Sequence, residues 1–254
     1  MYLVDYHTHP FAHGNISDYN IGLYKRYIDK AVNMGIKEIG FSDHDEYDQD
    51  LDLEIIDFLK KDSPIKVLKG LEFDYIPGRE GELSEKIKKY NLDYTIGSVH
   101  FIGDWGFDNP DYIKEYYKRD IDQCYIKYYE ILNSAVKSGL FNIIGHFDLI
   151  KVFGFFPKNN FKNIINSVLK NIKKNDLVLE INTNGVNKPV KEIYPSLNII
   201  ERAYEYKIPI TFGSDAHIVD RVGENIVKYA EVIKNIGYKE IAVFKNCNIS
   251  FELL

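Results

Sequence analysis

Seven histidines are the side chains of this sequence best suited to chemistry, because all of them fall within or just beyond short apolar runs. They are His7, His9, His13, His44, His100, His146 and His217. Runs rich in β-branched and aromatic residues are typical of strands. Imidazole is the commonest metal-ligating side chain. One histidine beside a strand is usually a core or surface residue, but seven in this position together predict a metal centre.

The spacing of two motifs favours a centre with more than one ion. His7-Thr8-His9 puts two imidazoles on the same side of an extended segment, because side chains two apart in a strand point the same way. Glu72 lies between Leu71 and Phe73 in an apolar run, so we expect its carboxylate to be buried and to need a cation. The two oxygens of such a carboxylate can bridge two ions that lie about 3.5–4 Å apart.

The other candidate ligands occur in motifs of the same kind, which end predicted strands. These motifs are Ser42-Asp43-His44, Gly97-Ser98-Val99-His100, Gly145-His146 and Ser214-Asp215-Ala216-His217. Together with Glu72 and Asp215, the histidines make nine nitrogen or oxygen donors, more than one tetrahedral zinc ion can use. Cys124 and Cys247 form no Cys-x-x-Cys motif, so we expect no thiolate site. The set predicts two or three divalent ions, with zinc, manganese and iron all suitable.

The elements that must position these residues alternate regularly along the chain. Strands are predicted at 2–6, 36–41, 65–74, 92–99, 141–145, 177–182 and 208–213, with a last short run at 239–244. Helices are predicted at 17–34, 51–61, 82–90, 110–138, 160–174, 190–206 and 222–235. This alternation indicates parallel strands with crossover helices. For 254 residues it favours a single α/β domain over 1–254, a closed or nearly closed barrel, with an open doubly wound sheet as the alternative.

Composition excludes several other classes of protein. The formal net charge of −6 and the pI near 5.7 give no general attraction to polyanions, so we expect no nucleic-acid partner. No apolar stretch approaches the roughly 18 residues of a membrane span. The first residues lack the basic start and apolar core of a signal peptide. We therefore expect a cytoplasmic protein with no membrane partner, and the sequence leaves its oligomeric state open.

Taken in order, the motifs resemble the metal motifs of the polymerase and histidinol phosphatase superfamily, and within it those of the histidinol-phosphate phosphatases. Three longer stretches carry the resemblance to that branch. They are Glu72-Phe73-Asp74-Tyr75-Ile76-Pro77-Gly78, Val99-His100-Phe101 with Trp105-Gly106-Phe107-Asp108, and Glu180-Ile181-Asn182-Thr183-Asn184-Gly185. The resemblance covers nearly the whole chain. It implies a distorted (β/α)7 barrel, related to the TIM barrel, with a trinuclear metal site.

The resemblance also implies how the ligands divide among the three ions. The first ion would use His7, His9, Glu72 and Asp215; the second would share Glu72 and add His100 and His146; the third would use His13, His44 and His217. A hydroxide held between the ions would attack phosphorus in line. Asp215 would orient or deprotonate this water, so Glu72, Asp215 and His217 are the predicted catalytic residues.

The implied reaction is hydrolysis of L-histidinol phosphate to L-histidinol and phosphate, a step of histidine biosynthesis. The predicted phosphate-binding residues are Lys151, Lys188 and Arg221, which follow strands five, six and seven. Arginines are common in this branch where this chain has Lys151 and Asn187-Lys188, and lysine lacks arginine's bidentate fork. Two alternatives therefore stay open: a phosphoesterase acting on another small phosphate ester or a nucleotide, and a metal-binding module without catalysis.

Overall fold

Seven parallel strands form the sheet at the centre of the computed structural model, which describes residues 1–14 and 19–254. The strands are β1 (Val4–Asp5), β2 (Glu38–Phe41), β3 (Lys66–Asp74), β4 (Tyr94–Ser98), β7 (Ile143–Ile144), β8 (Val178–Asn182) and β9 (Ile210–Gly213), in this order across the sheet. The amide of Tyr6 donates to the carbonyl of Phe212 at 3.0 Å, and that of His9 to the carbonyl of Ala216 at 2.9 Å. These bonds join the first and last strands, so the predicted nearly closed barrel is confirmed.

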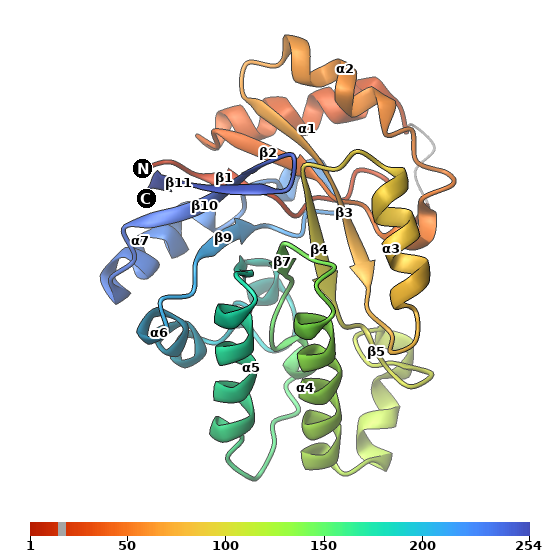
Figure 1. The fold of residues 1–254 in the computed structure, drawn as a ribbon, viewed down its shortest axis with the longest axis vertical. Helices are drawn as coiled ribbons and strands as arrows, with labels where there is room; N and C mark the ends of the chain where they lie inside the picture. Colours follow the sequence, from red (N-terminus) through yellow and green to blue (C-terminus); the bar gives the residue numbers. More distant parts are fainter. Residues whose placement is uncertain (15–18) are drawn as a thin grey trace.

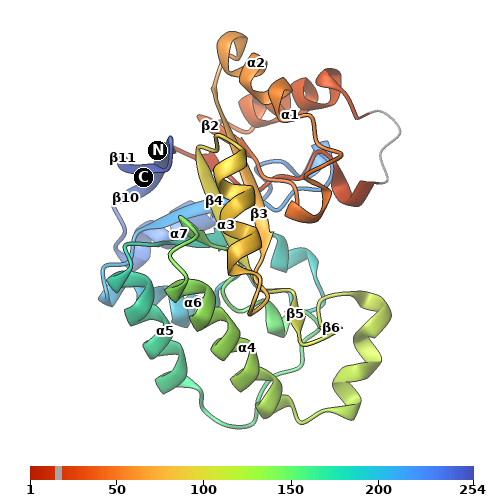
Figure 2. The same ribbon diagram turned by 45° about the vertical axis from the view of Figure 1, so that its right-hand side comes forward.

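Seven α-helices surround the barrel in the described part of the chain. They are α1 (Ile21–Asn33), α2 (Glu54–Asp62), α3 (Glu80–Lys89), α4 (Ile121–Lys137), α5 (Lys162–Lys174), α6 (Leu197–Glu205) and α7 (Ile226–Ile236). Helices α1 and α2 lie at one end of the molecule and α4 and α5 at the other (Figures 1 and 2). None of the helices in the described ranges combines the length and the apolar character that crossing a membrane requires.

Three helix predictions need correction or qualification. The predicted helix 110–138 is two elements, a 3-10 helix at Pro110–Lys118 and then α4, because the carboxylate of Asp120 accepts from the amide of Gln123 and starts a new helix. The predicted helix 190–206 begins only at Leu197, because Tyr194 pairs with Asn182 in extended backbone. Of the predicted helix 17–34, positions 17 and 18 lie outside the described residues, and α1 begins at Ile21.

The run at 239–244 forms a strand, but it lies outside the barrel. It is β10 (Glu240–Lys245), which pairs antiparallel with β11 (Asn248–Leu253), a strand that the sequence analysis missed. The polar–apolar alternation of 248–253 was the available signal. The ring of Phe244 lies 5.6 Å from that of Tyr6 and 5.8 Å from that of Tyr94, so the hairpin covers the N-terminal ends of the barrel strands. It also brings the two chain ends together (Figure 1).

Tyr94 fills the barrel interior beneath this hairpin. Its hydroxyl donates to the carbonyl of Tyr6 at 2.6 Å, and its side chain is fully buried. A Cβ at Gly40 would lie 2.0 Å from the Tyr94 side chain, and one at Gly70 would lie 2.4 Å from it. Glycine is therefore required at both positions by the close approach of the tyrosine, which reaches from β4 across β3 to β2.

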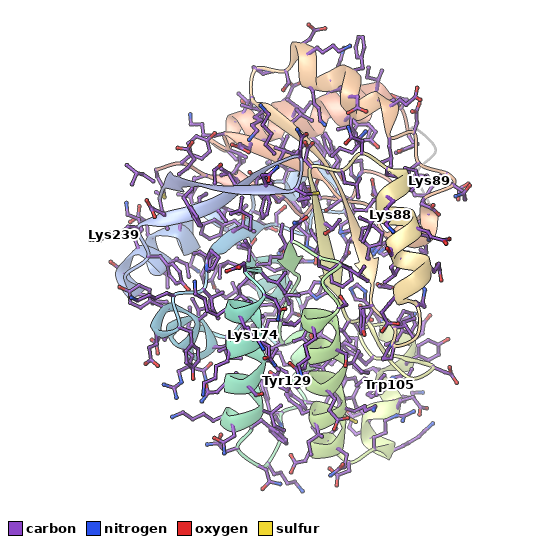
Figure 3. All side chains as sticks on the ribbon, viewed as in Figure 1. Lys88, Lys89, Trp105, Tyr129, Lys174 and Lys239 are labelled. Carbon is purple, nitrogen blue, oxygen red and sulfur yellow. The ribbon has the colours of Figure 1, made fainter. Side chains whose placement is uncertain are left out.

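A second hairpin, β5 (Phe101–Ile102) with β6 (Trp105–Gly106), follows β4 directly. The Trp105 ring is buried 4.7 Å from that of Tyr116, with the guanidinium of Arg119 4.5 Å from its centroid. Trp105 and Lys239 lie on opposite sides of the molecule in Figure 3. The β5–β6 hairpin therefore belongs to a different part of the barrel from the β10–β11 hairpin.

Candidate metal centre

The nine predicted ligands come together at the C-terminal end of the barrel strands. Most of them lie in the loops that directly follow strands, and Glu72 lies within β3 near its end. His7, His9, Glu72 and His146 are buried. Because all strands run in the same direction, their C-terminal ends meet at one mouth of the barrel, where the active sites of such folds lie.

One oxygen of the Glu72 carboxylate faces three histidines. Its Oε2 lies 3.2 Å from Nε2 of His7, 3.5 Å from Nε2 of His9 and 3.1 Å from Nδ1 of His44. The ligand atoms of His7, His9 and Glu72 form one compact group within 4.8 Å of one another. His7 and His9 belong to the first predicted ion and His44 to the third, so this oxygen faces members of both groups, and the division among ions stays a prediction.

The other oxygen of Glu72 faces the second pair of histidines. Its Oε1 lies 2.9 Å from Nε2 of His146 and 3.6 Å from Nε2 of His100, and these two nitrogens are 3.2 Å apart. The two oxygens of Glu72 therefore face different histidines, and His44 and His100, which lie on different oxygens, also form one compact group with Glu72. This is the arrangement that a carboxylate bridging two ions requires.

Asp215 and three rings form the outer part of the cluster. Oδ1 of Asp215 lies 3.4 Å from Nε2 of His9 and 3.4 Å from Nδ1 of His217. The ring of His13 stacks on those of His217 and His44, at centroid distances of 4.7 and 5.0 Å. The structure thus brings His13 beside the other residues of the third predicted group, and its role as a ligand stays a prediction.

The residues fit bound cations, because several buried nitrogens make no hydrogen bond with any described residue. These atoms are Nε2 of His7, both ring nitrogens of His9, Nε2 of His44 and Nδ1 of His146. Leaving one such buried group unsatisfied costs about 1–3 kcal/mol. Divalent ions that accept nitrogen and carboxylate ligands would satisfy most of these atoms at once.

The electrostatics of the cluster also favour cations. Burial raises the pKa of Glu72, but His7, His44 and His100 outweigh this effect and hold it well below its usual range. Burial and the neighbouring His217 and His44 lower the pKa of His9 well below that of a free imidazole. These two shifts favour the unprotonated forms of Glu72 and His9, which bind metals. Burial lowers the pKa of His7 and of His100, but Glu180 and Glu72 hold that of His7, and Asp74 and Glu72 that of His100, well above the usual range.

Two further carboxylates orient the histidine rings. Oε1 of Glu180 accepts from Nδ1 of His7 at 2.5 Å, and its Oε2 accepts from the amide of His146 at 2.6 Å. Asp74 pairs with Nδ1 of His100. The contacts with His7 and His100 leave Nε2 of each ring directed at Glu72, as outer carboxylates commonly do in metal sites, whereas the contact with His146 holds its backbone.

These orienting residues were not among the predicted site residues, although the strand period contained the signal. Asp74 is two residues after Glu72 in β3, so both point to the same face. Asp5 was missed in the same way, on β1 two residues before His7. Its carboxylate accepts from the amide and hydroxyl of Ser214 at 2.8 and 2.6 Å and so holds the segment that carries Asp215.

Of the three predicted phosphate-binding residues, only Lys188 lines the cavity beside the cluster. The cavity has a volume of about 90 Å³, and its lining is His13, His44, Glu72, His100, Asp108, His146, Leu149, Val152, Asn184, Lys188, Tyr194, Asp215 and His217. Arg221 does not line the cavity, but its guanidinium donates at 3.2 Å to Oδ1 of Asn184, which does.

Lys151 is buried away from the cavity. Its ammonium donates to Oε2 of Glu192 at 3.0 Å, to the carbonyl of Ile193 at 2.9 Å and to Oγ of Ser196 at 2.6 Å. All three protons of the ammonium are therefore engaged within the protein. The phosphate-binding roles of Lys151, Lys188 and Arg221 stay predictions, and the geometry gives its support to Lys188.

Comparisons with known proteins agree with this geometry. The family model described as "PHP domain" matches residues 5–184, and one described as "PHP-associated" matches residues 198–237. The chain is 32% identical to the "Probable histidinol-phosphatase" of Deinococcus radiodurans over 94% of this chain and 95% of that protein. It is 29% identical to the histidinol-phosphatase of Bacillus subtilis, over 86% of this chain and 95% of that one.

A solved structure has the same fold. The histidinol phosphate phosphatase of Lactococcus lactis, in complex with zinc, L-histidinol and phosphate, superposes with a TM-score of 0.80 at 24% identity, covering 98% of each chain. At this identity the likeness establishes the fold alone. The family models and the Deinococcus relative carry the assignment further: the chain belongs to the PHP domain family, the polymerase and histidinol phosphatase superfamily.

Proposed function

We propose that this protein is a metal-dependent phosphatase that hydrolyses L-histidinol phosphate to L-histidinol and phosphate. The observation that carries the proposal is the Glu72 carboxylate, whose two oxygens face two separate groups of histidine nitrogens at the mouth of the barrel. The chain spans nearly the full length of relatives that are named histidinol-phosphatases. The substrate is therefore a small phosphate ester.

Two or three divalent ions would be held by the predicted ligand set. His7, His9 and Asp215 would serve one side of Glu72, His100 and His146 the other, and His13, His44 and His217 the outer position. When bound, such ions supply a water nucleophile at neutral pH and neutralise charge on phosphoryl oxygens. The solved Lactococcus structure is a complex with zinc, so zinc is the first metal to test with this protein.

The protein's own side chains set the geometry of the proton transfer. Oδ2 of Asp215 accepts from the amides of Asn184 at 3.2 Å and Asn182 at 3.4 Å, which leaves Oδ1 facing His9. This orientation suits Asp215 as the proton acceptor for the attacking water. Lys188 would bind the phosphoryl group from the cavity wall as a point charge.

The proposal is tested by measuring phosphate release together with metal content. The panel of esters should include L-histidinol phosphate, a nucleoside monophosphate and the phosphate ester of an uncharged alkyl alcohol. We expect L-histidinol phosphate to give the highest kcat/KM, and His100→Ala to lose both turnover and bound metal. A strong preference for another ester would contradict the substrate. A full metal complement without turnover on any ester would favour a metal-binding module instead.

A further inference from the structure

The β5–β6 hairpin carries a carboxylate, Asp108, to the wall of the metal-bearing cavity. The amide of Phe107 donates to the carbonyl of His100 at 3.2 Å, so the hairpin folds back onto the end of β4. Asp108 follows directly and is one of the residues that line the cavity. It therefore lies beside a predicted metal ligand, without belonging to the predicted ligand set.

The segment before Asp108 is held firmly. Trp105 and Phe107 are both buried, and the Phe107 ring lies 5.5 Å from that of Tyr128 on α4. The carbonyl of Gly106 accepts from the amide of Asn109 at 3.3 Å and closes the turn around Asp108. Figure 3 shows Trp105 next to α4. The backbone of Asp108 is thus fixed by packing on one side and by hydrogen bonds on the other.

The carboxylate of Asp108 makes no hydrogen bond or ion pair with any residue in 1–14 or 19–254. The other acidic residues of the cavity are engaged, since Glu72 and Asp215 face histidines and asparagines. Asp74 and Glu180 behind them are bound to histidine rings. Asp108 acts electrostatically on its neighbour His100, whose pKa it helps to raise, but no described side chain forms an ion pair with it. A partly buried carboxylate held in this way is suited to receive a cationic group from a ligand.

The rest of the cavity wall defines where such a ligand would lie. Lys188 contributes a positive charge for a phosphoryl group, and Leu149, Val152 and Tyr194 contribute apolar surface. The cavity thus combines a metal-bearing end and a lysine with a separate carboxylate. A phosphate ester whose alcohol bears a positive charge would match all of these groups.

We propose that Asp108 binds the cationic group of the substrate and thereby makes the site selective for phosphate esters of amino alcohols. The inference rests on the proposed function, which it deepens by naming the residue that recognises the non-phosphate part of the substrate. A hydrogen bond to a charged group contributes about 1.5–3 kcal/mol, which corresponds to roughly ten- to hundredfold in selectivity.

The test compares Asp108→Asn with a matched control, Asp104→Asn. Asp104 lies at the exposed turn of the same hairpin and does not line the cavity. Two substrates of equal size, 2-aminoethyl phosphate and propyl phosphate, differ in the charge of the alcohol alone. We expect Asp108→Asn to reduce the ratio of their kcat/KM values roughly ten- to hundredfold, and Asp104→Asn to leave the ratio unchanged.

A binding measurement separates this inference from the proposed function. L-histidinol and inorganic phosphate are titrated separately into the metal-loaded wild type and both variants. Asp108→Asn should weaken L-histidinol binding by a factor similar to the selectivity change and leave phosphate binding as it was. If the wild type hydrolyses no ester, the proposed function fails, and the L-histidinol titration still decides the role of Asp108.

Two results would overturn the inference. Equal losses of kcat/KM on both substrates, with weaker binding of phosphate, would show that Asp108 stabilises His100 or the hairpin. Asp108 would then not bind the positive charge of the substrate. An unchanged kcat/KM ratio together with unchanged L-histidinol affinity would show that the cation binds elsewhere.

Discussion

The two ends of the barrel are formed by the same seven strands but differ in the side chains that they bring together. At the C-terminal end, histidines and carboxylates crowd together and several buried nitrogens make no hydrogen bond with any described residue. At the N-terminal end, Tyr6, Tyr94 and Phe244 pack ring against ring beneath the β10–β11 hairpin. The first end is suited to bind a ligand, and the interior of the second is filled by aromatic side chains.

This difference shows where stability and function reside in the molecule. A hollow of about 660 Å³ at the N-terminal end is larger than the cavity beside the histidine cluster, and its walls include Tyr204, Ile208 and Phe251 but no histidine. Size alone therefore points to the wrong end of the barrel. The unsatisfied buried donors and the shared carboxylate identify the functional end.

The largest effect is expected from removing the charge at the centre of the C-terminal end. Glu72→Gln should reduce kcat/KM by roughly a thousandfold or more, because it removes several kcal/mol of metal-dependent stabilisation. Glu240→Gln, an exposed glutamate at the N-terminal end, is the matched control and should retain activity. Turnover and bound metal are measured for both. Near-normal turnover in Glu72→Gln would show that the two histidine groups do not depend on a shared carboxylate.

Phe244→Ala should act on stability instead. Removing this fully buried ring should lower the free energy of unfolding by about 3–5 kcal/mol. Metal content and kcat/KM per folded molecule should stay close to those of the wild type. Urea unfolding measures the free energy of unfolding. Metal content and kcat/KM are measured at low denaturant, where the variant is folded. A loss of bound metal in the folded variant would mean that the two ends are coupled.

Chelation should destabilise the protein from the C-terminal end. At free metal a hundredfold above Kd, removing one ion costs about 2.7 kcal/mol of stability. Hydrogen exchange should then increase in the segments 7–9 and 215–217, with β10 unaffected. Uniform acceleration along the chain would show that the metal centre supports the whole fold and not one end of it.

The smallest effect is expected from a carboxylate behind the cluster. Asp74→Asn should weaken metal binding roughly ten- to hundredfold, because Asp74 orients the His100 ring. Asp93 is a buried aspartate at the N-terminal end, where its Oδ2 accepts from the amide of Lys69 at 2.9 Å. Asp93→Asn should change stability and leave metal affinity unchanged. Equal metal affinities for the two variants would remove the distinction between the ends.

The barrel and the positions of the ligands could be predicted from the sequence because both depend on local patterns. Each of the motifs that end in His44, His100 and His146 follows its strand closely, so knowing the strands placed the imidazoles at the same end. The strand β11 was missed because its pattern is short. Its turn places Asn246 and Cys247 at positive φ, a conformation that asparagine favours and cysteine does not, so the turn signal was incomplete.

Contacts between distant segments were the part that sequence could not supply. Lys151 follows a barrel strand, as a phosphate-binding residue would, yet the segment carrying Glu192 and Ser196 folds over it and engages its ammonium. Glu180 binds His7 across 173 positions of sequence. Such partners are set by the closure of the barrel and not by neighbouring residues.

The position of Tyr94 between Gly40 and Gly70 has a consequence for how this sequence can change over time. A larger residue at either glycine would collide with the tyrosine ring, whereas after Tyr94→Ala the same replacement would fill vacated space. The three positions should therefore show strong epistasis, with a measurable coupling energy in a double-mutant cycle. Among related barrels, the residues at these positions should covary in volume, and the order in which substitutions arise should decide which of them survive.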